Sequence, residues 1–176
     1  MTNVKWRDIN DMADVRAKRT YQEAVEQGKN AQEVLAFFSE LGRDNSRTPM
    51  QWDDSENGGF SNGKPWIKCN DNYKEINVMN QINDPNSLYS FYKRLIKCYH
   101  DHADVMSQGA FYPMYEQYRG LIAYKRKSDK NELLVIVNFT DSQMETIDVG
   151  QNCVLCNYKE MEQKFMRPYE ARIYCK

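Results

Sequence analysis

The sequence predicts an α+β protein in which helices come first, a long ordered loop follows, and a small antiparallel β-sandwich completes the chain. Three observations carry this prediction. Apolar residues recur at helical spacing up to His102. Between Gly42 and Asn83 the pattern is interrupted by a stretch with little helical or strand periodicity. After His102 the chain alternates in short segments separated by turn residues. We therefore expect two domains, residues 1–103 and residues 104–176.

Two helices are expected before the loop. The first begins at Asp11 and stops at Gly28. The second has Asn30 as its N-cap and Glu33 three residues later, which is the spacing of a capping box. The predicted apolar face of this second helix consists of Val34, Phe37, Phe38 and Leu41. The predicted apolar face of the first helix consists of Ala17, Tyr21, Ala24 and Val25.

The loop from Gly42 to Asn83 is expected to be ordered, although it is rich in Asn, Asp, Gly and Pro. Apolar and aromatic residues are interleaved through it, and a disordered linker would lack such anchors. They are Trp52, Phe60, Trp66, Ile67, Tyr73 and Ile76.

A third helix is expected over "NDPNSLYSFYKRLIKCYHDH", with Asp84 as its cap and Pro85 at the first helical position. The strand segments after it are "GAFYPMY", "GLIAYKRK", "ELLVIVNFT", "METIDVG", "NCVLCNY" and "EARIYCK", with "SDKNE" as a hairpin connection. Their spacing is typical of a compact antiparallel sandwich.

Composition excludes several classes of function. With 24 basic and 25 acidic residues spread along the chain, no basic patch indicates a nucleic-acid partner. The longest apolar run, "LLVIVNF", is too short to span a bilayer, so no membrane partner is expected. The five cysteines form an odd set on a chain without a leader sequence, which favours the cytoplasm. Cys153 and Cys156 have no second pair, so we expect thiols and neither a metal nor another cofactor.

The loop also contains the residues best suited to chemistry. Arg43 and Arg47 flank "DNS", a spacing at which both guanidinium groups can reach one face of a turn, and Asp44 is placed to hold one of them by two hydrogen bonds. The alternative is that these arginines only tie the loop to its own backbone. The acids of "WDDSEN" are closer to solvated turn residues than to a catalytic pair or a calcium loop.

The segments "RDNSRTPMQWDDSENGGFSNGKPWIKCNDNYKEINV" and "DPNSLYSFYKRLI" resemble the C-terminal part of bacterial oligo-1,6-glucosidases. These belong to the α-amylase superfamily, glycoside hydrolase family 13, with dextran glucosidases, trehalose-6-phosphate hydrolases and sucrose isomerases. The resemblance runs from "MTNV" to "RPYEARIY" and so covers nearly the whole chain.

This resemblance implies that residues 1–103 are the last loop and helices of a (β/α)₈ barrel, followed by its C-terminal sandwich. In the family, the catalytic aspartate, glutamate and second aspartate come from earlier barrel strands. The "RDNSRTPMQW" loop covers the catalytic face, and one of its arginines binds the non-reducing glucose. By position, Arg47 is the first candidate for substrate binding and Arg43 the second, with no catalytic residue in this chain. Gly42 departs from the serine that is common in relatives.

The sequence therefore predicts the C-terminal fragment of a cytoplasmic α-glucosidase of short α-1,6-linked glucosides, inactive by itself, whose full-length parent binds an oligosaccharide. A stand-alone carbohydrate-binding or interaction module, using the loop with Trp52 or Trp66, is one alternative, and half of a split glucosidase is another. Because Phe91, Leu95 and Ile96 would have faced the barrel, we also expect self-association through the third helix.

Overall fold

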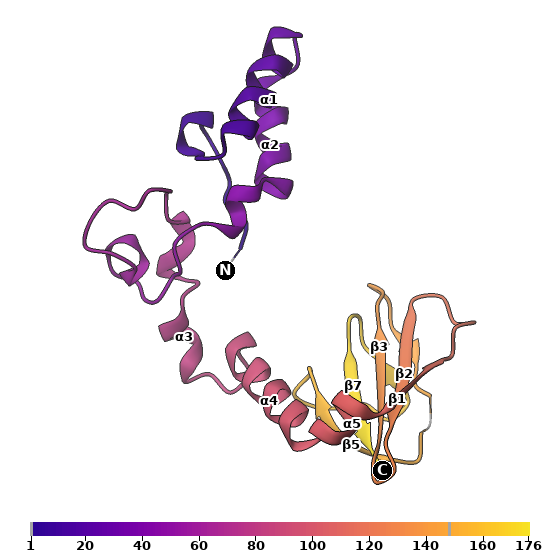
Figure 1. Cartoon of the computed structure of the whole chain (residues 1–176). Helices are drawn as coiled ribbons and strands as arrows, with labels where there is room; N and C mark the ends of the chain where they lie inside the picture. Colours follow the sequence, from indigo (N-terminus) through magenta and orange to yellow (C-terminus); the bar gives the residue numbers. More distant parts are fainter. Residues whose placement is uncertain (1, 148) are drawn as a thin grey trace. The chain divides into compact units, whose positions relative to one another are not determined.

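The computed structural model describes residues 2–147 and 149–176. The chain divides into two compact units, an N-terminal unit of residues 1–84 and a C-terminal unit of residues 85–176 (Figure 1). The predicted domain boundary after residue 103 follows the change in sequence pattern, and it stays a prediction.

The N-terminal unit begins with a 3₁₀ helix, η1 (Ile9–Asp11), followed by helices α1 (Val15–Glu26) and α2 (Ala31–Leu41). Both predicted helices are present, but α1 begins later than the expected start at Asp11. The cause is Asp14, whose carboxylate accepts a hydrogen bond from the backbone N–H of Arg16 and so caps the helix.

A tight turn joins α1 to α2. Gly28 takes a left-handed conformation with φ of 82°, which an L-residue with a side chain adopts at a cost. The Lys29 N–H reaches back to the Ala24 carbonyl at 3.0 Å, closing a Schellman-type turn. Asn30 then caps α2 by accepting from the N–H of Gln32, as predicted. The short connection leaves α1 and α2 side by side (Figure 1).

The core of this unit brings together residues that lie far apart in the sequence. Its buried members are Val4, Trp6, Met12, Ala17, Leu35, Phe38 and Ile67. The predicted apolar face of α2 was partly wrong. Leu35 and Phe38 are buried, whereas Phe37 and Leu41 are exposed, because the side of α2 that faces the core is centred on Leu35 and not on Phe37.

The expected long loop is ordered and contains four short helical segments. They are η2 (Arg43–Ser46), η3 (Glu56–Gly59), η4 (Asp71–Lys74) and α3 (Val78–Ile82).

The C-terminal unit opens with α4 (Leu88–Asp101) and α5 (Ala103–Gln108). The prediction that Asp84 caps the third helix was wrong. Ser87 is the cap, and its hydroxyl accepts from the N–H of Ser90 at 3.1 Å. Ser is as good an N-cap as Asp, and its position directly before Leu88 sets the first turn.

Among the described residues, seven strands follow. They are β1 (Ala110–Met114), β2 (Leu121–Lys127), β3 (Glu132–Asn138), β4 (Met144–Glu145), β5 (Asn152–Cys156), β6 (Phe165–Met166) and β7 (Ala171–Cys175). Five form an antiparallel sheet in the order β1-β2-β3-β7-β5, and β4 pairs with β6 in a second, two-stranded sheet. The prediction of helices followed by antiparallel β structure is confirmed. The hairpin at "SDKNE" is also present, closed by the Ser128 N–H to Asn131 carbonyl bond.

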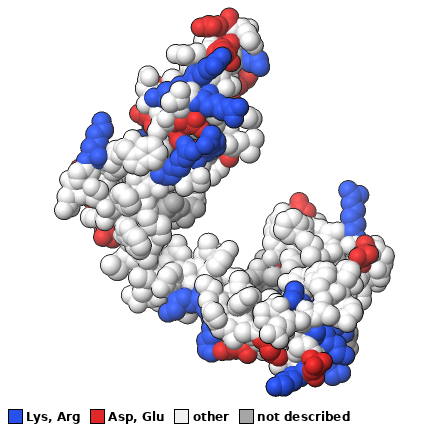
Figure 2. Space-filling model, viewed as in Figure 1, with Lys and Arg blue, Asp and Glu red and all other residues white. Residues whose placement is uncertain are grey.

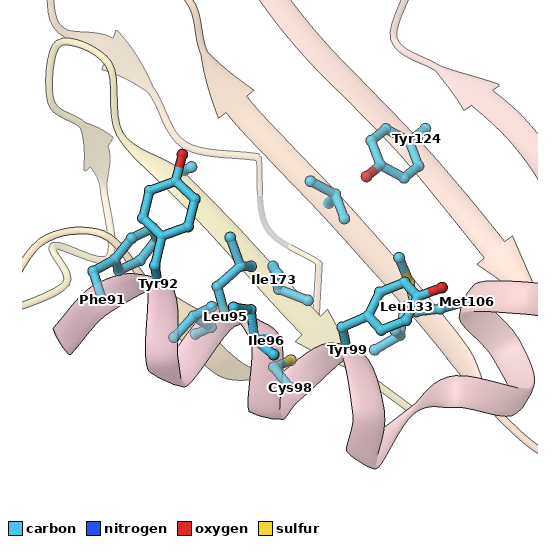
Figure 3. Close-up of a pocket in the computed structure, with 13 residues that line it drawn as sticks. Phe91, Tyr92, Leu95, Ile96, Cys98, Tyr99, Met106, Tyr124, Leu133 and Ile173 are labelled. Carbon is cyan, nitrogen blue, oxygen red and sulfur yellow. The ribbon is translucent and has the colours of Figure 1, made fainter. Parts of the chain in front are cut away.

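The large sheet is covered differently on its two faces. Leu134 and Ile136 of β3 belong to a core that includes Met166 of the small sheet. Leu133 and Val135 point the other way, towards α4 (Figure 3), because successive strand residues alternate between faces. Being covered on both sides explains why β3 is continuously apolar from Leu133 to Val137 instead of alternating.

Two strand predictions need correction. The segment "METIDVG" forms a strand only at Met144–Glu145, and its position 148 lies outside the described residues. The strand β6 was missed, since two residues are too few to produce an alternating pattern.

Candidate functional site

The turn that carries the two predicted arginines is fixed by Asp44. This carboxylate is fully buried, and its Oδ2 accepts from the backbone N–H groups of Ala13, at 2.7 Å, and Asp14, at 2.9 Å. Backbone donors satisfy a buried carboxylate that would otherwise be costly. Asp44 therefore joins η2 to the segment that leads into α1.

Asn45 makes the second connection, which sequence reasoning missed. Its Oδ1 accepts from the backbone N–H of Val4 and from Nε1 of Trp6, each at 3.2 Å. Its Nδ2 donates to the carbonyls of Phe38 and Ser39 at the end of α2. All parts of this amide are used to hold backbone segments together, so Asn45 is structural.

The two arginines remain at the surface of this fixed turn. Nη1 of Arg47 lies 3.4 Å from Oδ1 of Asp44, and the Arg47 side chain is 35% exposed. Nε of Arg43 lies 3.7 Å from the Asp14 carboxylate, and its side chain is 61% exposed. The expected two-pronged bond from Asp44 is wrong, because only one long contact forms. A guanidinium has five N–H donors, so Arg47 is anchored and retains donors for a further acceptor.

The acids that follow Trp52 shape the loop. Asp53 accepts from both the N–H and the hydroxyl of Ser55, and these bonds lower the pKa of its carboxyl. This agrees with the expectation that these acids are turn residues. A carboxyl held in its ionised form is unsuited to act as a general acid near neutral pH.

The pair of glycines in this loop has a conformational cause. Asn57, Gly58 and Gly59 have φ values of 55°, 66° and 66°, a run of left-handed residues. Such a run suits Asn and Gly and strains other residues. A Cβ on Gly59 would also lie 2.6 Å from the Asp53 carboxylate. The backbone conformation of this turn therefore favours Asn and Gly at these three positions.

Buried amides hold the remaining loop. Gln51 is almost fully buried, and its Nε2 donates to the Ile76 carbonyl at 2.6 Å and to Oδ1 of Asn72 at 3.0 Å. Asn70 donates to the carbonyls of Thr2 and Asn3 at 3.2 Å. Amide side chains here replace the backbone ladders that an irregular segment lacks. The high Asn content was the available signal, and it was interpreted only as a loop composition.

The cysteines are free thiols, as expected. Burial raises the pKa of the thiols of Cys153 and Cys156, which makes them poor nucleophiles. Among the described residues, no group of three or more His, Cys, Asp or Glu side chains is arranged to hold a metal ion. Within the same residues, no helix combines the length and the hydrophobicity that crossing a bilayer requires.

The triplet "NFT" at Asn138 matches the N-x-[ST] pattern of a glycosylation acceptor, but its role is structural. Asn138 is fully buried, and its Nδ2 donates to the carbonyls of Ser142 and Arg167. Its Oδ1 accepts from the N–H and hydroxyl of Thr140. No glycan can be attached to this amide in the folded chain.

The C-terminal unit contains an apolar cavity of about 600 Å³ between α4 and the large sheet (Figure 3). Its lining residues are Phe91, Tyr92, Leu95, Ile96, Cys98, Tyr99, Met106, Tyr124, Leu133, Val135, Leu155, Ala171 and Ile173. None of them carries a carboxylate, imidazole, amine or guanidinium group. The cavity therefore offers no charged side chain for catalysis, and its polar groups are the Cys98 thiol and the tyrosine hydroxyls.

A second cavity, of about 500 Å³, lies in the N-terminal unit and is polar in character. Trp66 and Tyr73 line it with acids, amides and two lysines. Arg43 and Arg47 are not among its lining residues. Figure 2 shows basic and acidic side chains interspersed on the visible face of the molecule.

Comparison with known proteins gives consistent matches. The family model described as "Alpha amylase, catalytic domain" matches residues 1–109. An oligo-1,6-glucosidase of Parageobacillus thermoglucosidasius is 39% identical over 99% of this chain and 33% of its own length. A trehalose-6-phosphate hydrolase of Bacillus subtilis is 34% identical over the same shares.

Solved structures agree. A trehalose-6-phosphate hydrolase of Bacillus licheniformis matches with a TM-score of 0.90 at 34% identity, over 99% of this chain and 34% of that one. An isomaltulose synthase from Erwinia rhapontici matches with a TM-score of 0.85 at 35% identity, over 99% and 33%. The chain thus spans about a third of the length of these relatives. It is similar to the C-terminal part of an oligo-1,6-glucosidase. By the match of the catalytic-domain model to most of its residues, the chain belongs to the alpha-amylase family.

Proposed function

We propose that this chain is the C-terminal fragment of an α-glucosidase that acts on short α-1,6-linked glucosides, and that it is inactive by itself. The observation that carries the proposal is the match along 99% of the chain to oligo-1,6-glucosidases, at 39% identity with that of Parageobacillus thermoglucosidasius. In relatives of this kind the catalytic carboxylates come from earlier barrel strands, so this chain contributes other parts of the active site.

Its contribution is the arginine turn. Arg47 binds a sugar hydroxyl or ring oxygen of the substrate, and Arg43 supports it. Two features of the molecule support this role. Asp44 and Asn45 fix the backbone of the turn, and Arg47 has one contact, at 3.4 Å, with Asp44. A positioned guanidinium with spare donors suits neutral oxygen acceptors as well as carboxylates.

The described carboxyls support the lack of activity. Retaining hydrolysis needs one carboxyl with a raised pKa as proton donor and a second as nucleophile, about 5–5.5 Å apart. The four described carboxyls whose pKa departs from its ordinary value, those of Asp53, Asp104, Glu132 and Glu170, are all shifted downwards. An arginine cannot replace either carboxyl.

Three further expectations belong to this proposal. Residues 1–103 derive from the end of the barrel domain and residues 104–176 from the sandwich that follows it. The protein works in the cytoplasm, which agrees with its five free thiols. Its ligand in the parent enzyme is an oligosaccharide, without a metal, a cofactor, a nucleic acid or a membrane.

Self-association through α4 is the proposed partner interaction. Phe91, Leu95 and Ile96 all line the apolar cavity. Phe91 and Leu95 are half-buried there, whereas Ile96 is also exposed to solvent. The exposed apolar residues of α4 are Leu88, Tyr89, Tyr92, Ile96 and Tyr99. A contiguous apolar stripe of this kind favours a protein partner, and a second copy of the chain can supply an identical stripe.

One sample tests both parts of the proposal. We expect the purified chain to release no p-nitrophenol from p-nitrophenyl α-glucoside and no glucose from isomaltose above a mock preparation. Light scattering after size exclusion is expected to show an oligomer, and Ile96→Glu is expected to return it to a monomer. Turnover above the mock preparation would overturn the lack of activity, and a monomer at every concentration would overturn the self-association.

A further inference from the structure

The cavity beside Trp66 in the N-terminal unit is formed by four segments of the chain. Its lining residues are Asn10, Asp11, Glu56, Asn57, Lys64, Pro65, Trp66, Lys68, Cys69, Asp71 and Tyr73. They come from η1, from η3, from the stretch between η3 and η4, and from η4 itself. Its volume of about 500 Å³ lies in the range of pockets that hold small ligands. We call it the Trp66 cleft.

Trp66 is exposed because its neighbour is buried. Ile67 is 2% exposed and belongs to the core formed with Val4 and Trp6. This anchors the backbone at position 67, while the Trp66 side chain stays 70% exposed. An exposed aromatic residue alone is unremarkable on a protein surface. Here, however, the indole lines a cavity to which acids, amides and lysines also contribute, and an indole combines a broad apolar face with a polar edge.

The polar walls of the cleft are fixed by hydrogen bonds and by an ion pair. Asn57, in its left-handed turn, donates from Nδ2 to the carbonyls of Ser61 at 3.1 Å and Gly63 at 3.4 Å. Lys68 and Asp71 form an ion pair at 3.0 Å. The Asn57 amide is therefore held in place before any ligand arrives, which reduces the entropy lost on binding.

The charge of the walls disfavours an anionic ligand. Three carboxylates, of Asp11, Glu56 and Asp71, line the cleft together with the ammonium groups of Lys64 and Lys68. A phosphate or other anion would therefore meet more negative than positive charge. Carboxylates and amides together present both acceptors and donors, which suits a ligand with many hydroxyl groups.

We propose that the Trp66 cleft binds a glucosyl unit of a neutral α-glucan, with one face of the sugar ring on the indole and its hydroxyls on the polar walls. This site is separate from the arginine turn and performs no chemistry. The choice of an α-1,6-glucan as ligand rests on the proposed function, whereas the cleft and its preference for a neutral polyol do not.

The test is a titration of the full chain with isomaltotriose by calorimetry, with ligand-observed NMR on the same samples. We expect saturable binding. Trp66→Ala is expected to weaken it by about tenfold or more, a loss of the size that one central aromatic contact carries. Trp66→Phe retains a flat aromatic face and is expected to bind within about fivefold of the unaltered chain.

Trp52→Ala is the matched control. Trp52 is a half-exposed indole in the same loop region and is not among the residues that line the cleft. We expect this variant to bind as the unaltered chain does. Absence of saturable binding by both isomaltotriose and maltotriose, or equal weakening by Trp66→Ala and Trp52→Ala, would overturn the proposal.

The result is separable from that of the proposed function. Binding is measured without hydrolysis, and a chain that leaves isomaltose intact, as the proposed function expects, yet binds isomaltotriose equally well after Trp66→Ala would contradict the cleft alone. If isomaltotriose fails to bind but maltotriose binds with loss on Trp66→Ala, the α-glucan site stands and the α-1,6 linkage assigned through the proposed function is wrong, whereas binding of cellotriose alone would overturn the α-glucan site itself.

Discussion

The N-terminal and C-terminal units stabilise irregular backbone by different means. In the N-terminal unit, Asp44, Asn45 and Gln51 each serve two or more groups in neighbouring segments. In the C-terminal unit, the hydrogen bonds between strands satisfy most backbone N–H and C=O groups. Glu170 and Arg172 add a buried ion pair. The comparison teaches that the first unit depends on many small contributions, while the second depends strongly on one pair of charges.

The tryptophans allow the two units to be measured separately. All three, Trp6, Trp52 and Trp66, lie in the N-terminal unit. Their fluorescence therefore reports unfolding of that unit, and amide hydrogen exchange of β3 and β7 reports unfolding of the other.

The largest effect is expected for Glu170→Gln. Glu170 and Arg172 are almost fully buried, and Oε1 of Glu170 lies 2.8 Å from Nε of Arg172. Removing one charge leaves the other buried without its partner, which costs about 3–5 kcal/mol in the free energy of unfolding. Exchange protection of β3 and β7 should fall accordingly, with the tryptophan transition unchanged. Glu160→Gln, at an exposed position, is the control, and equal small effects of both variants would refute the importance of the pair.

The same pair makes the C-terminal unit sensitive to acid. Burial alone would raise the pKa of Glu170, but hydrogen bonds from Arg172 and Arg167 outweigh burial and hold the pKa below its ordinary value of 4.5. A group whose pKa is lower in the folded state contributes stability above its ordinary pKa, and this is lost as the pH falls through the folded pKa.

Exchange protection of β3 should therefore decrease below about pH 4.5, and Glu170→Gln should make this decrease shallower. The lowered pKa values of Asp104 and Glu132 act in the same direction. In the N-terminal unit, Asp53 is the described carboxyl with a shifted pKa, and it is partly exposed to solvent. If the unfolding transition seen by tryptophan fluorescence changed more with pH than the exchange protection of β3, the N-terminal unit would be the more acid-sensitive of the two.

Asp44→Ala is expected to cost about 2–3 kcal/mol, because the N–H groups of Ala13 and Asp14 lose a charged acceptor in a buried place. The tryptophan transition should show the loss, while β3 protection stays unchanged. Asp54→Ala, on the exposed part of the same loop, should have an effect within about 0.5 kcal/mol. If Asp44→Ala had an equally small effect, the turn would be held by other groups.

Substitutions at two glycines distinguish the cost of a left-handed backbone conformation from the cost of a steric clash. Gly28 has φ of 82° with open space at its Cβ position, so Gly28→Ala should cost about 1 kcal/mol for conformation alone. Gly59→Ala adds a conflict with the Asp53 carboxylate at 2.6 Å and should cost more. The two variants are compared by denaturant titration of the tryptophan signal. An equal cost would mean that Asp53 moves aside freely.

The smallest effect concerns the apolar cavity. Ala171 lines it from β7, and Ala171→Val adds two methyl groups to a strand position that suits a β-branched residue. Filling the space should stabilise the C-terminal unit by about 0.5–1 kcal/mol, measured as slower exchange in β7. Ala123→Val, on the buried opposite face of the sheet, should instead destabilise it by overpacking. Destabilisation by both variants would show that the cavity closes in solution.

Periodicity in the sequence was sufficient for the regular elements. The cap at Asn30, the turn at Gly28 and the hairpin at "SDKNE" followed from local rules, because their partners are a few residues away. Local rules failed where two residues near one helix start were both suitable N-caps. Asp84 and Ser87 are both good caps, and the register of α4 decided between them.

The buried polar residues could not be predicted. Asn45, Asn138 and Arg172 are ordinary surface types in the sequence, and their partners are defined only by tertiary contacts. For the same reason the sequence placed Arg43 and Arg47 on a common turn but assigned Asp44 to hold an arginine. The fold uses that carboxylate mainly for the backbone of Ala13 and Asp14.

The central claim is that this chain supplies a substrate-binding arginine to an active site whose carboxylates lie elsewhere. A chimera tests it most directly, in which this chain replaces the matching third of the Parageobacillus thermoglucosidasius oligo-1,6-glucosidase. We predict hydrolysis of isomaltose by the chimera, a loss of about a hundredfold or more in kcat/KM with Arg47→Ala, and none of this activity in the chain alone. An Arg47→Ala chimera as active as the unaltered one would contradict the claim.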